Sequence, residues 1–150
     1  MKKIRAIRIK KILEESPDLS DLGTFSKEKG KFAIEHKGDR GTLPYFNADN
    51  VENMKQAKQN YERMMQFETG LVCQYEIKAE AEILTSSDKG QTWLINAVSS
   101  GGVWGIESDS DKEYFKEIAD GELEELKDVL RELGFSQVEC DQGEIDWGDL

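Results

Sequence analysis

Apolar and polar residues alternate strictly over residues 73–83, and this is the clearest pattern in the chain. Cys73, Tyr75, Ile77, Ala79, Ala81 and Ile83 alternate with Gln74, Glu76, Lys78, Glu80 and Glu82. A period of two predicts a β-strand with one buried face and one solvated face. Turn-forming residues follow at 86–90, and then Trp93, Ile95 and Ala97 share one face of a second alternating run. The pattern therefore predicts an antiparallel hairpin.

Two further segments have weaker strand patterns. Residues 3–12 are rich in isoleucine, but their alternation slips near Ala6. Residues 31–36 also alternate, and turn-forming residues stand at 16–18 and 38–41. We therefore expect two more strands, both in the first quarter of the chain.

Two segments have the periodicity of amphipathic helices. The first spans about residues 50–68, where Asp49 or Asn50 is placed to cap it. The second spans about residues 110–133 and is followed by Gly134, a residue typical of helix ends. Its apolar residues occupy one half of a helical wheel. These residues are Tyr114, Phe115, Ile118, Leu123, Leu126, Val129, Leu130 and Leu133.

Glu122 interrupts the apolar half of the second helix. Because the neighbouring Gly121 weakens the helix, we expect a kink that turns Glu122 toward solvent. The order of strands and helices predicts an α+β fold, an antiparallel sheet of four to five strands with two helices packed on one face. At this length, residues 1–135 are expected to form a single domain.

The last segment, residues 136–150, mixes acidic and apolar residues. This composition is typical of an acidic tail that orders on contact with a partner. A final edge strand at 136–140 followed by a frayed end fits the same residues equally well. Both interpretations stay open.

Charge is distributed unevenly along the 150 residues. The chain has a net charge of −11, which divides into +3 for residues 1–75 and −14 for residues 76–150. The first eleven residues hold six cations and no acid, namely Lys2, Lys3, Arg5, Arg8, Lys10 and Lys11. Such a field steers partners but does not specify a fold.

The acidic residues of the second helix lie on one outward stripe. They are Glu113, Glu117, Asp120, Glu124 and Asp128, and the acids Asp141, Glu144 and Asp146 follow in the tail. We predict that these eight residues form an acidic surface for a basic partner protein. Acids on one helix recur about every 5–6 Å, whereas duplex DNA carries one charge per ~1.7 Å of axis. The stripe alone is therefore too sparse to imitate a duplex.

Catalytic signatures are missing from the sequence. His36 is the only histidine, and its position favours a structural role. Asp109, Asp111 and Glu113 only partly match the opening of a calcium loop. Glu107, Asp109 and Asp111 are weak candidates for a divalent metal site. The glycines of residues 101–105 lack the pattern of a phosphate loop and indicate a tight turn or bulge, with Trp104 in the core. We expect no cofactor.

Membrane and export signals are also missing. No apolar run approaches the roughly 18 residues of a membrane span, and no signal-peptide pattern follows the basic start. Cys73 and Cys140 do not form a C-x-x-C pair and are expected to be reduced thiols. The composition thus favours a cytoplasmic protein without membrane partners.

Several short strings together resemble a known group of proteins. They are Ser16–Ser20 with Leu22-Gly23, Tyr45-Phe46-Asn47, Tyr61–Met64, Ala79–Ile83, Ser100–Asp111 and Leu133-Gly134-Phe135. The group comprises small, uncharacterised acidic proteins of phage, plasmid and other mobile-element genomes, and the likeness spans about residues 4–135. It implies a mobile-element product in a bacterial cytoplasm. It also implies a likeness to small acidic inhibitors of host or defence enzymes.

Three functional hypotheses follow. The leading one is a non-catalytic interaction protein whose acidic surface binds a basic partner, such as a protein that handles nucleic acid. The second is a nucleic-acid-binding module that uses the basic N-terminal strand, which the net charge of −11 opposes. The third is a divalent-metal enzyme that uses the carboxylates at 107–113.

Overall fold

The computed structural model describes residues 1–37 and 43–150, so the turn expected at 38–41 lies outside the described residues. The chain is α+β and divides into two compact units. Unit 1 comprises Met1–Glu14 and Gln74–Leu150, and unit 2 comprises Glu15–Cys73. Unit 2 is an insertion between two paired strands of unit 1, and both units contain residues of the 1–135 span that the sequence predicts as a single domain.

Unit 1 is built on two long antiparallel strands, β1 (Lys2–Leu13) and β5 (Gln74–Thr85). Their register shifts between Ile4 and Ala6. This bulge explains the slip in alternation near Ala6, because one extra residue reverses the faces of those before it. The apolar side chains of the predicted strand face the core from Tyr75 to Ile83, and Ile77, Ala79 and Ala81 are fully buried.

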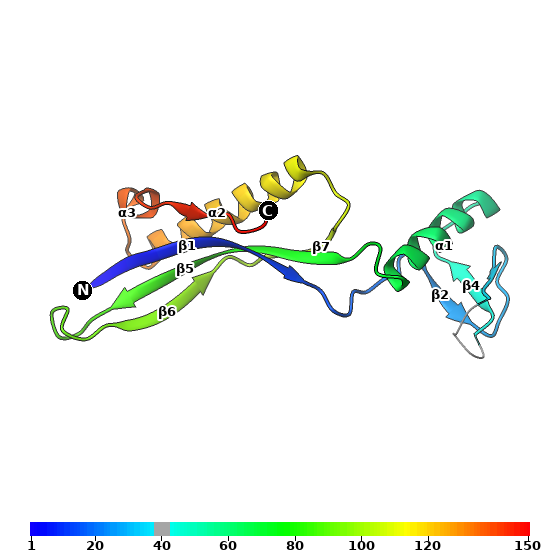
Figure 1. Ribbon diagram of the computed structural model, residues 1–150, viewed down its shortest axis with the longest axis horizontal. Helices are drawn as coiled ribbons and strands as arrows, with labels where there is room; N and C mark the ends of the chain where they lie inside the picture. Colours follow the sequence, from blue (N-terminus) through cyan, green and yellow to red (C-terminus); the bar gives the residue numbers. More distant parts are fainter. Residues whose placement is uncertain (38–42) are drawn as a thin grey trace. The chain divides into compact units, whose positions relative to one another are not determined.

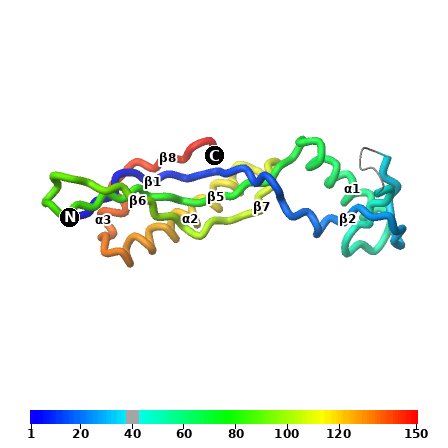
Figure 2. Tube along the Cα trace, turned by 90° about the horizontal axis from the view of Figure 1, so that it is seen from below, coloured from blue at the N-terminus to red at the C-terminus, as the bar shows by residue number. Residues whose placement is uncertain are grey.

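Three more strands complete the sheet of unit 1. β6 (Leu94–Ser99) and β7 (Val103–Glu107) both pair antiparallel with β5, one after the other. β8 (Ile145–Asp146) pairs parallel with β1 on the other side, so the sheet is mixed rather than purely antiparallel. Figure 2 shows β6 and β8 along opposite sides of unit 1, in agreement with the strand order β6-β5-β1-β8.

The helix α2 (Lys112–Glu132) packs on one face of this sheet. Phe115, Ala119, Leu123, Leu126 and Leu130 are its buried apolar residues, and they lie against the apolar face of β1 and β5. Gly134 (φ +93°) ends the helix in a Schellman motif, in which Phe135 N–H bonds to the Leu130 carbonyl at 3.1 Å. Figure 1 shows α2 on one side of the sheet together with a short third helix.

That third helix, α3 (Gln137–Asp141), replaces the strand predicted at 136–140. Ser136 caps it by accepting a hydrogen bond from Glu139 N–H, and the Glu139 carboxylate accepts one from Ser136 N–H. The residues after α3 are docked on the core, since Ile145, Trp147 and Leu150 pack against it. The 136–150 segment is thus ordered in the fold, and its apolar residues are the reason.

Unit 2 contains three short strands and one helix. β2 (Gly23–Ser26), β4 (Tyr45–Ala48) and β3 (Ile34–Glu35) form an antiparallel sheet in that order, and α1 (Met54–Glu68) follows. Phe46 is fully buried, and its ring lies 5.3 Å from that of Phe25 and 5.5 Å from that of Tyr61. The helix begins later than predicted because Asn53, and not Asp49 or Asn50, accepts the capping hydrogen bond from Gln56 N–H.

His36 has a structural role in unit 2, as its sequence position favoured. Its Nδ1 lies 2.8 Å from the Tyr61 hydroxyl oxygen, and its ring centroid lies 4.8 Å from that of Phe25. The imidazole therefore joins the small sheet to α1 by a hydrogen bond and an aromatic contact.

Candidate partner-binding surface

The outward face of α2 carries the five predicted acids, and all of them are exposed. They are Glu113, Glu117, Asp120, Glu124 and Asp128. Successive intervals of four, three, four and four residues keep them on one side of an α-helix. The opposite side of the helix is fixed on the sheet by the buried leucines. Sequence reasoning thus located the face correctly, because burial of one apolar stripe leaves the other stripe in water.

Cations of the same helix divide this row into two parts. Near the C-terminal end, Arg131 pairs with Asp128, and Lys127 Nζ lies 3.9 Å from the Glu124 carboxylate. Among the described residues, none forms an ion pair or side-chain hydrogen bond with Glu113, Glu117 or Asp120. The N-terminal part of α2 therefore carries the uncompensated negative charge. We name Glu113, Glu117, Asp120 and Glu124 the α2 acidic stripe, of which Glu124 alone has an ion pair among the described residues.

The three predicted tail acids do not join this stripe. Asp141 accepts hydrogen bonds from Gln137 Nε2 and from Lys127 Nζ, each at 2.8 Å, and these bonds lower the pKa of the Asp141 carboxyl. Glu144 and Asp146 line a cleft of about 480 Å³ together with Lys3 and Arg5 of β1. The eight predicted residues therefore fall in three places, and only the five on α2 share one face of an element.

The basic N-terminal strand compensates the sheet and not the α2 acidic stripe. On the open face, Arg8 lies 3.0 Å from Glu82, and Lys10 lies 3.0 Å from Glu80. On the helix face, the ammonium group of Lys11 lies 4.7 Å from the centre of the Phe115 ring. Glu80 and Glu82 are thus engaged within the protein.

Glu122 contradicts the prediction of an outward kink. The helix α2 is continuous through Gly121, and the Glu122 side chain is buried at 5% exposure. Its carboxylate accepts a hydrogen bond from the backbone N–H of Gly102 at 2.9 Å, and Glu125 accepts one from Gly101 at 3.1 Å. A buried carboxylate is tolerated when it accepts hydrogen bonds in this way.

The glycine-rich segment 101–105 comprises the end of the turn after β6 and the first three residues of β7, so it does not precede the helix directly. Gly102 has φ +85°, and a Cβ atom there would lie 2.7 Å from Glu76 Oε1. The positive φ favours glycine at this position. The register of β7 against β5 shifts between Tyr75 and Ile77, so the segment also contains a bulge. The hydrogen bonds to Glu125 and Glu122 leave no N–H of Gly101 or Gly102 for an external anion. Trp104 is 61% exposed, so the expectation that it fills the core was wrong.

The weak metal candidates occupy separate structural roles. Glu107 ends β7, Asp109 lies in the following turn, and Asp111 is the N-cap residue of α2. Within residues 1–37 and 43–150, no group of three histidine, cysteine or acidic side chains is arranged to hold a metal ion.

Cys140 is buried at 3% exposure, and this burial raises the pKa of its thiol.

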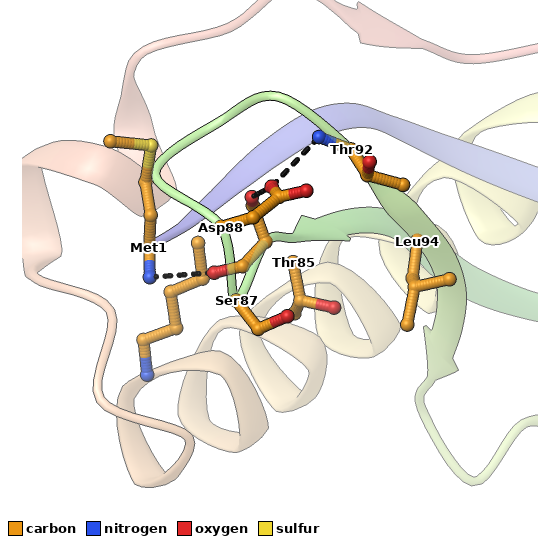
Figure 3. Close-up of a pocket in the computed structure, with 8 residues that line it drawn as sticks. Met1, Thr85, Ser87, Asp88, Thr92 and Leu94 are labelled. Atoms are coloured by element: carbon orange, nitrogen blue, oxygen red, sulfur yellow. Dashed lines mark hydrogen bonds between the residues drawn. The ribbon is translucent and has the colours of Figure 1, made fainter.

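Where the chain start meets the 86–92 turn, a cleft of about 670 Å³ opens (Figure 3). Several of its polar groups are hydrogen-bonded to one another. Asp88 Oδ1 accepts hydrogen bonds from Ser86 Oγ and from Thr92 N–H, each at 2.8 Å, and the Met1 ammonium donates to the Ser86 carbonyl at 3.2 Å. These groups therefore stabilise the turn, and the cleft is better described as part of a hydrogen-bonded turn than as a ligand site.

This turn gives a pH prediction. Hydrogen bonds lower the pKa of Asp88 from 3.8 to about 2, and the bond from Thr92 N–H has the largest effect. A lowered pKa means that the carboxylate stabilises the turn above pH 3.8 and loses this effect as pH falls through about 2. We expect the Asp88 carboxyl carbon to titrate near 2 by NMR. A midpoint at the ordinary value would contradict these hydrogen bonds.

In the described part of the chain, no helix has both the length and the apolar character of a membrane span. Comparisons of the chain with protein-family models, with curated proteins and with solved structures find no match.

Proposed function

We propose that the protein is a non-catalytic interaction protein whose α2 acidic stripe binds a basic surface on a partner protein. The observation that supports this most is the contrast along α2. Asp128 is compensated by a neighbouring cation, whereas Glu113, Glu117 and Asp120 point into solvent with no ion pair within the described residues. Exposed charges of one sign raise the rate of encounter with an oppositely charged partner.

The rigid placement of the stripe supports the same proposal. Six residues of α2 are buried, and the tail packs along its flank, where Trp147 and Leu150 share a cleft with Lys112 and Lys116. The helix is therefore held in place before a partner arrives, which lowers the entropy lost on binding. The cations Lys112 and Lys116 lie on the tail side, so the stripe itself stays acidic.

A bacterial mobile element is the context that we propose for this activity, with a basic protein that handles nucleic acid as the partner. Such partners carry Lys and Arg where they contact phosphates. Four acids along one helix can pair with a row of these Lys and Arg side chains, but they do not imitate a complete duplex. The proposal therefore predicts competition with one part of a nucleic-acid site.

The test compares two variants that remove three negative charges each. The first is Glu113→Gln with Glu117→Gln and Asp120→Asn on α2. The control is Asp21→Asn with Glu52→Gln and Glu62→Gln, which are exposed residues of unit 2. Both variants change the net charge from −11 to −8. A difference between them thus reports the stripe and not the total charge.

Immobilised wild-type chain is expected to capture a basic, nucleic-acid-binding protein from a bacterial lysate. The α2 variant should bind that protein roughly tenfold to hundredfold more weakly, because each exposed ion pair contributes about 0.5–1 kcal/mol. The unit 2 variant should bind it like the wild type, and binding should weaken with salt. Equal losses in both variants, or capture of acidic proteins only, would count against the proposal.

A further inference from the structure

The outer edge of β6 has no strand partner in the described structure. β6 stands at the end of the strand order β6-β5-β1-β8 and pairs only with β5 (Figure 2). An edge strand presents a row of unpaired backbone N–H and C=O groups that can pair with another chain. The opposite edge, β8, is only two residues long and contains Asp146. The two edges therefore differ in their capacity to accept a strand.

β6 lacks the features that protect edge strands. It contains no proline and no charged residue, and the uncharged stretch around it extends from Gly90 to Ile106. Leu94 and Ile95 are 66% and 58% exposed. In a chain with 34% charged residues, a neutral stretch of this length on an exposed edge indicates a surface for association.

Charge also indicates which partner fits this edge. In a two-fold dimer, the interface brings the same surface of both copies together. In a chain with a net charge of −11, most surfaces are acidic, and two copies of such a surface would repel each other. The β6 edge avoids this repulsion because it is neutral. We propose that the β6 edge pairs antiparallel with β6 of a second copy, which joins the two five-stranded sheets into one continuous sheet.

The side chains of β6 favour one register for this pairing. The pairs with β5 place Leu94 and Val98 on the helix face of the sheet, and Ile95 and Ala97 on the open face. A two-fold axis through Asn96 places Leu94 opposite the partner's Val98 and Ile95 opposite the partner's Ala97. Apolar residues then meet apolar residues on both faces. An axis through Ala97 would instead place Ile95 opposite serine.

The first test is the concentration dependence of the mass in sedimentation equilibrium. Between about 1 μM and about 1 mM, the wild-type chain should shift from one chain per particle to two. Asn96→Lys places two lysines opposite each other on the axis and should weaken the dimer at least about tenfold. Ser87→Lys adds the same charge in the exposed turn before β6 and should leave the dimer unchanged.

Salt and a cross-link provide independent tests. Raising the salt concentration from about 0.1 M to about 1 M should tighten the dimer, because it screens the repulsion between two acidic chains. Binding through the α2 acidic stripe should weaken under the same change, so the two proposals fail separately. Asn96→Cys should form an intermolecular disulfide on oxidation that the wild type, with its two native thiols, does not form.

Several results would overturn the proposal. These are a wild-type chain that stays monomeric over the whole range, a dimer that Asn96→Lys and Ser87→Lys weaken equally, and a dimer in which the Asn96→Cys variant does not cross-link. If the lysine at position 96 disturbs the strand itself, the Asn96→Cys cross-link still tests whether two β6 strands pair. Pairing of the edge with an unrelated extended peptide in a monomeric chain would also count against a second copy as the occupant.

Discussion

A chain in which the dipeptide Asn-Gly replaces residues 15–73 is expected to keep the fold of unit 1. The strands β1 and β5 are paired up to Leu13 and Tyr75, and Glu14 N–H donates to the Gln74 carbonyl at 2.9 Å. Glu14 and Gln74 thus stand opposite each other where unit 2 begins and ends. A two-residue type I′ turn joins such a pair without a change of register.

Tryptophan fluorescence measures this result, because Trp93, Trp104 and Trp147 all belong to unit 1. The shortened chain should unfold cooperatively, with the same emission in the native state as the full chain. A second shortened chain, with a Gly/Ser linker of about ten residues in place of the dipeptide, controls for the turn. If neither chain gives a cooperative transition, unit 1 depends on unit 2. If only the linker chain folds, the turn geometry is wrong.

Leu126→Ala is expected to lower the free energy of unfolding of unit 1 by roughly 2–5 kcal/mol. Leu126 is completely buried in the middle of α2 and belongs to the core cluster formed with β1 and β5. Truncation removes apolar contacts and leaves a cavity that close-packed neighbours fill only partly. Denaturant unfolding monitored by tryptophan fluorescence gives the change for unit 1 alone.

Leu133→Ala is the matched control for this experiment. Leu133 is the C-cap residue of the same helix and is 46% exposed. The same truncation should therefore cost less than about 1 kcal/mol. Similar losses at both positions would mean that the sheet face of α2 is not the centre of the core.

The elements that could be predicted from the sequence are those whose signal is local. Strict alternation predicted β5, and the apolar half of the helical wheel predicted α2 and its outward acids. Ile95 and Ala97 do share a face with each other, but it is the open face of the sheet, opposite Leu84 and Glu82. Alternation identifies a strand, whereas the face that is buried depends on where the helix packs.

Features that depend on distant residues were missed. β8 is only two residues long and pairs with Ile7 and Arg8 from the other end of the chain. Glu122 is accommodated because Gly102, in the turn between β6 and β7, donates its backbone N–H to the Glu122 carboxylate on α2. The ion pairs of Arg8 and Lys10 required the register of β1 against β5. None of these partners is visible in a local window of sequence.

The insertion of unit 2 also has a consequence for the order of folding. β1 leaves the ribosome before β5, and its main partner β5 follows only after the whole of unit 2 has been made. Closing a long flexible loop between them costs conformational entropy. If unit 2 is already folded, the flexible chain that must be closed between β1 and β5 is shorter. Early collapse of the aromatic cluster around Phe46 would therefore speed the docking of the first strand, and mutations in that cluster would slow it.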